Sequence, residues 1–98
     1  MINTEDKYKE HLELCNQLHN TYIKKNHDYG DSFGKTFDTL GIISAATRIT
    51  DKYNRFIELA LHNNPQVQES IEDTLMDMAN YCLMTVIELL LKPKGENN

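Results

Sequence analysis

The sequence lacks the signatures of several common protein classes. Only two cysteines occur in its 98 residues, Cys15 and Cys82, with neither a CxxC pair nor a nearby pair of histidines, so we do not expect a zinc site. Both lie within helical apolar patterns, which predicts small buried thiols in a reducing compartment. The sequence contains no Ser-His-Asp, Cys-His or P-loop pattern. These enzyme types are therefore not indicated.

An excess of positive charge is also missing. The net charge of −5 argues against a generic nucleic-acid coat protein, which would carry a basic face, so we expect no direct DNA or RNA binding. The N-terminal segment MINTEDKYKEHLEL is charged and lacks the apolar block of a signal peptide. The run over 74–91 is long enough to cross a bilayer, but Asp77, Asn80 and Glu88 interrupt it. We expect a cytoplasmic protein with no membrane partner.

What the sequence does contain is helical patterning. It predicts an all-α fold with three main helices, over about residues 4–26, 42–62 and 70–91, because apolar residues there follow the 3.6-residue period or run nearly continuously. Turn residues predict a short irregular connection at 28–40, with at most one helical turn at 36–40. No strand pattern is present. We expect one domain over 1–98, with a frayed tail at 93–98.

The last predicted helix is unusually apolar. Most residues from 74 to 91 are apolar, and a three-helix monomer would leave one side of such a helix in water. We therefore expect a homo-oligomer, a dimer or a tetramer, that associates through this helix. Ser70 is expected to begin the helix in a capping box with Asp73.

Polar residues form a line along this helix. Asp73, Asp77 and Asn80 have spacings of i, i+4 and i+7, which place them on one face. Two carboxylates one turn apart could share a magnesium ion. Alternatively, Asp73 only caps the helix and Asp77 only pairs with Arg48 or Lys52.

A second line is cationic. Arg48, Lys52 and Arg55 also recur at i, i+4 and i+7, with Asp51 beside them. Arginine binds phosphate through two parallel hydrogen bonds and lysine acts as a compact charge, so these residues could hold a phosphate group. The alternative is a solvated face, or internal salt bridges to the acids of the last helix.

The segment NHDYGDSFGKTF is the third candidate. Its aromatic rings could stack on a base and its polar side chains could contact the same ligand. The aromatic residues are Tyr29, Phe33 and Phe37, and the polar ones are Lys25, Asp28 and Ser32. Alternatively, the aromatic residues only fill the core.

Three motifs in this order resemble the nucleotide modification associated domain 1 family of small phage and bacterial proteins. They are a DYGxSF-like loop at 28–33, an R-x-x-D-K-x-x-R helix at 48–55 and an E-S-I-x-D-T-L-x-D-x-A-N-Y helix at 69–81. The resemblance covers roughly residues 20–90. The helical plan is also similar, more distantly, to the MazG-like all-α nucleoside triphosphate pyrophosphohydrolases.

These resemblances imply a nucleotide-binding protein of phage or prophage type that acts in nucleotide metabolism or modification, in the cytoplasm of a bacterial host. By resemblance to MazG-like enzymes, Asp73 and Asp77 are candidate magnesium ligands and catalytic residues of a pyrophosphohydrolase. Where those enzymes carry paired glutamates, this chain has Asp51 among cations, which favours phosphate binding over binding of several magnesium ions. The alternatives are a non-catalytic sponge for a nucleotide signal of antiphage defence, and a purely structural oligomer. The expected ligand-binding residues are Lys25, Asp28, Tyr29, Ser32, Phe33, Arg48, Asp51, Lys52, Arg55 and Asn80.

Overall fold

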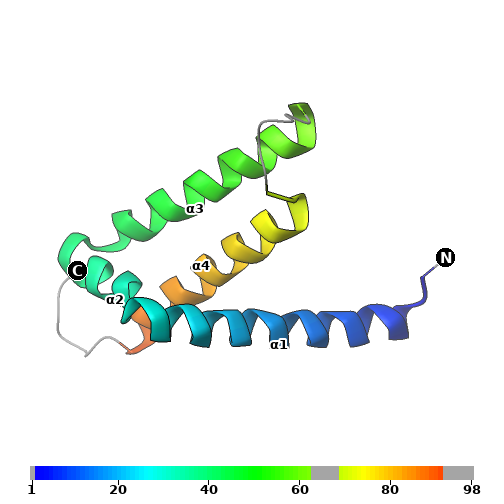
Figure 1. Ribbon diagram of the computed structural model, residues 1–98, viewed down its shortest axis with the longest axis horizontal. Coiled ribbons are helices and arrows are strands. Elements are labelled where there is room, and N and C mark those ends of the chain that lie inside the picture. The colour runs from blue at the N-terminus through cyan, green and yellow to red at the C-terminus, as the bar shows by residue number, and fades with distance from the viewer. Residues whose placement is uncertain (1, 63–68, 92–98) are drawn as a thin grey trace. The chain divides into compact units, whose positions relative to one another are not determined.

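The computed structural model of the protein describes residues 2–62 and 69–91. Most of these residues are helical and none of them forms a strand, which confirms the all-α class. The elements are α1 (Thr4–Tyr29), α2 (Ser32–Leu40), α3 (Ile42–Ile57), the π-helical turn η1 (Glu58–His62) and α4 (Ile71–Leu91) (Figure 1). The chain divides into two compact units, Met1–Asp31 and Ser32–Asn98, which are described separately below. The expected single domain stays a prediction.

The first unit consists of the long helix α1, whose two ends are capped. The side chain of Asn3 accepts a hydrogen bond from the Asp6 backbone N–H at 2.8 Å, which satisfies one of the free donors of the first turn. Gly30 ends the helix in the left-handed conformation, with φ 61° and ψ 46°, and its N–H donates to the Asn26 carbonyl. Glycine adopts this conformation without strain and therefore ends the helix here. The last residue of α1 is Tyr29, so the helix ends later than the predicted end at about residue 26.

The prediction of an irregular connection at 28–40 is wrong. Residues 32–40 form helix α2, so the described residues contain four α-helices and not three. Turn-forming glycine, serine and aspartate obscured the pattern, but Phe33 and Phe37 lie one turn apart and are both buried. Packing of these rings outweighs the low helix propensity of Gly34 within the same helix.

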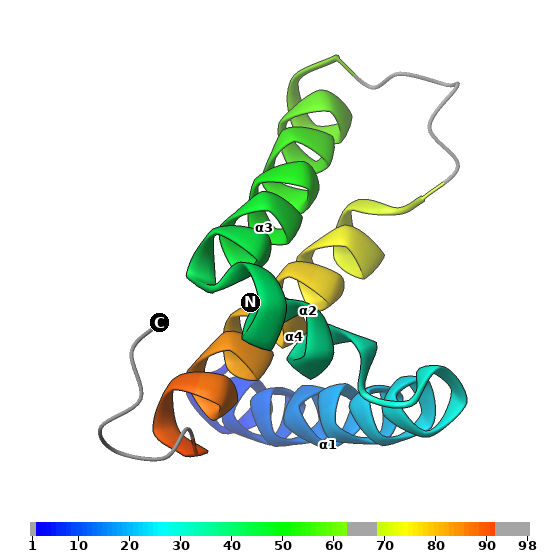
Figure 2. The ribbon, with the colours of Figure 1, turned by 90° about the vertical axis from the view of Figure 1, so that its left-hand side faces the viewer.

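The core of the second unit lies where α2, α3 and α4 meet (Figure 2). Phe33, Phe37 and Ala45 are buried there, and Tyr81 and Met84 of α4 pack against them. The Phe33 ring centroid is 6.0 Å from that of Tyr81 and 6.5 Å from that of Phe37. This aromatic cluster fixes α2 against α4.

A single residue, Gly41, connects α2 to α3. Its φ of 75° lies in the region that favours glycine, and this conformation lets α3 start directly after α2 ends. The Ser44 hydroxyl donates to the Gly41 carbonyl at 2.8 Å. The helix predicted over 42–62 is therefore present, with its last turn, η1, in π-helical form.

Both cysteines are free, as expected, but the prediction that they are buried is wrong, because Cys15 and Cys82 are exposed. Each apolar pattern located the helix face correctly but did not reveal whether another element covers it. The expected break after His62 and the expected tail at 93–98 fall outside the described residues.

Within the described part of the chain, α4 alone is long and apolar enough to cross a membrane, judged by length and composition. Core helices of soluble proteins can meet the same criterion. Only Thr74 of α4 is buried, and the other residues of this helix are half-buried or exposed.

Candidate functional site

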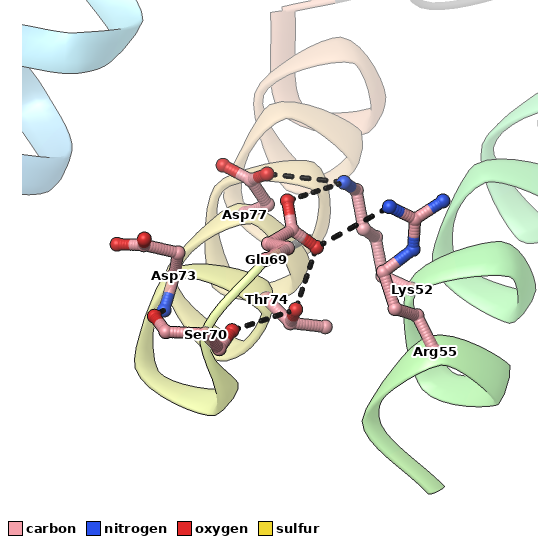
Figure 3. A network of polar contacts seen from close by, with 7 residues as sticks. All are labelled: Lys52, Arg55, Glu69, Ser70, Asp73, Thr74 and Asp77. Carbon is pink, nitrogen blue, oxygen red and sulfur yellow. Dashed lines mark hydrogen bonds and ion pairs between the residues drawn. The ribbon is translucent and has the colours of Figure 1, made fainter. Parts of the chain in front are cut away.

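Lys52 joins α3 to α4 through two carboxylates. Its Nζ donates a hydrogen bond to Asp77 Oδ2 at 3.0 Å and lies 3.5 Å from Glu69 Oε1 (Figure 3). The side chains of Lys52 and Asp77 are only 19% and 27% exposed. The structure therefore forms the Lys52–Asp77 pair, which was one of the two alternatives for Asp77.

The two carboxylates keep Lys52 charged. Desolvation is the largest single effect and acts to lower the pKa of Lys52, but the hydrogen bond and charge of Asp77 and the charge of Glu69 together outweigh it. The pKa of Lys52 is therefore raised above its ordinary value of 10.5. Lys52 is a permanent cation at neutral pH and not a general base.

Glu69 is the point where the polar contacts meet. Its Oε2 lies 3.7 Å from Arg55 Nη1 and accepts a 2.6 Å hydrogen bond from the Thr74 hydroxyl. The same hydroxyl lies 2.9 Å from the Ser70 carbonyl, so its one proton is shared between two acceptors. Thr74 is fully buried and holds Glu69 in place beneath the two cations.

Ser70 begins α4 as expected. Its hydroxyl oxygen accepts a hydrogen bond from the Asp73 backbone N–H at 3.0 Å, which confirms this half of the predicted capping box. The Asp73 carboxylate points away from Lys52 and Glu69 (Figure 3).

Asp73 and Asp77, the two acids expected to share a magnesium ion, point in different directions. The Asp77 carboxylate is bound to Lys52, and the Asp73 carboxylate points elsewhere. Among residues 2–62 and 69–91, no group of three or more His, Cys, Asp or Glu side chains is placed to hold a metal ion. Magnesium binding by Asp73 and Asp77 therefore stays a prediction.

Arg48 extends the cationic line along α3. Its guanidinium carbon lies 6.0 Å from the centroid of the Tyr81 ring, a cation–π distance. Tyr81 stacks in turn on Phe33. Arg48, Lys52 and Arg55, which we call the cationic strip, thus all contact residues of α4 or the residue Glu69 just before it.

The remaining predicted site residues lie in different environments. Asp51 on α3 and Ser32 at the start of α2 are exposed, and Asn80 on α4 is half-buried. Phe33 is 7% exposed and belongs to the core, so it has no free ring face on which a base could stack. For Phe33, the alternative that the aromatic residues fill the core is therefore the correct one.

Three predicted residues belong to the other compact unit. Lys25, Asp28 and Tyr29 lie in the last part of α1 and are exposed. The Asp28 carboxylate lies 3.6 Å from the imidazole of His27. Their role in ligand binding stays a prediction.

Sequence reasoning missed the roles of Glu69 and Thr74. A signal was present, because Thr74 is a polar residue inside an apolar run and follows Ser70 by four residues. A threonine hydroxyl at that position can bond the carbonyl one turn back. The further contact to Glu69 depends on how the chain enters α4 and was not visible in the pattern.

The fold and the charged network define a small helical protein with an ion-pair cluster between two adjacent helices. The model of the family described as nucleotide modification associated domain 1 matches residues 25–89, so the chain belongs to that family. No curated protein and no solved structure matches the chain. The more distant MazG-like similarity therefore stays a prediction.

Proposed function

We propose that this protein binds a nucleotide and holds its phosphate with the cationic strip. One observation carries the proposal: Lys52 and Arg55, nearly one turn apart, converge on the single carboxylate of Glu69, at 3.5 Å and 3.7 Å. The charged ends of the two cations therefore meet at one point, and the Arg55 side chain there is half exposed, so a further anion can approach it from solvent. Membership of the family supports a nucleotide as the source of that anion.

Arg55 has unused hydrogen-bonding capacity. Its side chain is half exposed, and its contact with Glu69 at 3.7 Å is longer than a hydrogen bond. A guanidinium carries five N–H donors in a planar fork that fits two phosphate oxygens. A phosphate arriving from solvent can therefore bind Arg55 while Glu69 stays bonded to Thr74.

The acids hold the cations in position before the ligand arrives. Lys52 is fixed by Asp77 and Glu69, so little side-chain entropy remains to be lost on binding. The Arg48 guanidinium carbon lies 6.0 Å from the centroid of the Tyr81 ring, and Arg48 extends the strip by one turn. The chain has a net charge of −5, but both of its arginines and Lys52 follow one another at helical spacing along α3.

The side-chain arrangement supports binding rather than hydrolysis. The Lys52 ammonium takes up the Asp77 carboxylate that a magnesium-dependent pyrophosphohydrolase would use. We therefore propose that the nucleotide is bound and released unchanged, as in the sequestering of a nucleotide signal. The enzyme alternative makes the opposite prediction, namely magnesium-dependent turnover that Asp77→Ala abolishes.

A thermal-unfolding panel of nucleotides tests the proposal. We expect one class of phosphorylated nucleotide to stabilise the protein, by about 2.7 kcal/mol at 100 times its dissociation constant. A chelator should leave the effect unchanged. Chromatography of the incubated nucleotide should recover it intact, and loss of either result would contradict binding without hydrolysis.

A matched pair of variants locates the site. Arg55→Ala removes a half-exposed cation of the strip and should weaken binding at least tenfold, whereas Lys35→Ala removes an exposed cation of α2 and should not. Both variants lose one positive charge, so a difference between them is specific to position. Equal binding by Arg55→Ala and the parent would contradict the assignment.

A further inference from the structure

Glu69 acts on the two cations beside it by its charge rather than by hydrogen bonds. Its carboxylate oxygens lie 3.5 Å from Lys52 Nζ and 3.7 Å from Arg55 Nη1, both beyond the usual N–H···O range of about 2.7–3.2 Å. Its short contact, at 2.6 Å, is with the neutral hydroxyl of Thr74. Lys52 donates its hydrogen bond to Asp77 instead. Thr74 therefore holds a negative charge beside both cations (Figure 3).

A phosphate that binds Arg55 comes close to this fixed charge. Arg55 is half exposed, and its guanidinium nitrogen Nη1 is 3.7 Å from the Glu69 carboxylate. An anion hydrogen-bonded to the same guanidinium lies within roughly 9 Å of that carboxylate. This distance is comparable to the Debye length of about 8 Å at physiological salt, and the Glu69 side chain is only 22% exposed, so solvent screens the repulsion only in part.

The repulsion depends on the charge of the phosphate. A terminal phosphate carries a charge of about −1.5 to −2 at neutral pH, whereas a phosphate esterified twice, a phosphodiester, carries about one negative charge. The two cations and the two acids joined at Lys52 and Glu69 have formal charges that cancel. The cluster therefore has no surplus positive charge to offset a second negative charge on the ligand.

We propose that Glu69 makes this site selective for a phosphodiester over a terminal phosphate, because its fixed carboxylate repels the second charge of the terminal group. This selectivity rests on the phosphate-binding role proposed above for the cationic strip, and it adds the class of phosphate. Glu69 is the specificity-determining residue, and Thr74 is a positioning residue that acts through it. The nucleotides that stabilise the protein in the thermal panel should accordingly contain a phosphodiester.

Side-chain NMR of the arginines tests this selectivity with two simple anions. Arg48 and Arg55 are the only arginines of the chain, so Arg48→Lys assigns their two Nε–H signals. The probes are inorganic phosphate, at a pH well above its second pKa, and dimethyl phosphate, which has a single charge. Glu69→Gln removes the charge but keeps an oxygen that can accept the Thr74 hydrogen bond. It should tighten the binding of inorganic phosphate at least about fourfold and that of dimethyl phosphate about twofold.

Two further variants separate charge at this position from other effects. Glu69→Asp keeps the charge and should not tighten the binding of either anion. Asp38→Asn removes one negative charge from an exposed residue of α2, a helix that packs on α4 near Tyr81, more than two helical turns from Glu69. It should leave both affinities at the wild-type values. Circular dichroism checks that each variant keeps its helical content.

The outcomes distinguish this selectivity from phosphate binding itself. If the Arg55 signal of the wild type responds to the anions but Glu69→Gln tightens neither, or tightens both equally, the selectivity is overturned and phosphate binding by the strip stands. A thermal panel in which only nucleotides with terminal phosphates stabilise the wild type has the same meaning and needs no variant. If Arg55 responds to neither anion in the wild type and in Glu69→Gln, and the nucleotide panel is flat, both proposals are overturned.

Discussion

The Lys52–Asp77 pair should be a measurable link between α3 and α4. A double-mutant cycle with Lys52→Met and Asp77→Leu isolates it, because each substitution replaces a charged side chain by an apolar one of similar size. Lys52→Met should be the more destabilising single change, since it removes the cation from both Asp77 and Glu69. After Asp77→Leu, Lys52 still has Glu69 at 3.5 Å.

The magnitude follows from distance and burial. Exposed ion pairs couple by about 0.2–1 kcal/mol, and breaking a fully buried pair by removing one partner costs about 3–5 kcal/mol. Here the two side chains are 19% and 27% exposed and their atoms are 3.0 Å apart. We therefore expect each single change to destabilise by about 1.5–3 kcal/mol and the coupling energy to be about 1–2 kcal/mol.

Urea unfolding followed by circular dichroism measures the four free energies at one pH and salt concentration. The double variant should be more stable than the sum of the two single losses predicts. Thermal midpoints provide a check, because about 1 kcal/mol corresponds to about 4–8 °C in a domain of this size. A coupling energy below about 0.3 kcal/mol would show that water screens the pair as it does on an open surface, and the reasoning from burial would then be refuted.

Two further outcomes follow from the same network. Thr74→Val keeps the shape of a fully buried side chain but removes its 2.6 Å hydrogen bond to Glu69, so it should cost about 1.5–3 kcal/mol of unfolding free energy. Thr47→Val, at an exposed hydroxyl bonded only within its own helix, is the control and should change it by less than about 0.5 kcal/mol. Because the pKa of Lys52 is raised, its stabilisation is complete below pH 10.5 and is lost as the pH rises through the higher folded-state pKa. The stability difference between wild type and Lys52→Met should therefore be constant from about pH 7 to 9 and shrink as the pH rises above 10.5, and a difference that grows with pH would contradict this sign.

Local signals in the sequence were sufficient for much of the fold. The 3.6-residue period located α1, α3 and α4, and the capping residue Ser70 located the start of α4. Helical spacing also placed Lys52 and Asp77 on faces that could meet. These features depend on residues within a few turns of one another, which is why the sequence alone reveals them.

Features that depend on tertiary packing were not predictable in the same way. Helix α2 exists because Phe33 and Phe37 pack in a core completed by Tyr81, which lies far along the chain, and turn-forming residues concealed the period. Cys82 is exposed because the residues of α4 that pack on the core of the second unit are Tyr81 and Met84, on another side of the helix. An apolar pattern identifies a face that avoids water but not the element that covers it.

The sequence also did not show how the candidate binding residues pack, so their roles could be decided only from the structure. Phe33 carried a signal that suits a base-stacking residue and a core residue equally well, and its burial decides between them. The strip residues gave a charge pattern compatible with a ligand or with internal ion pairs. The structure forms ion pairs at Lys52 and Arg55 while half of the Arg55 side chain stays open to solvent.

Isothermal titration with a nucleotide from the stabilising class and with its unphosphorylated nucleoside tests the central claim most directly. If the cationic strip holds the phosphate, the nucleotide binds at least a hundredfold more tightly than the nucleoside, and its affinity falls as salt is added. Equal affinities for the two compounds, unaffected by salt, would contradict the claim that phosphate recognition by this strip is what the protein does.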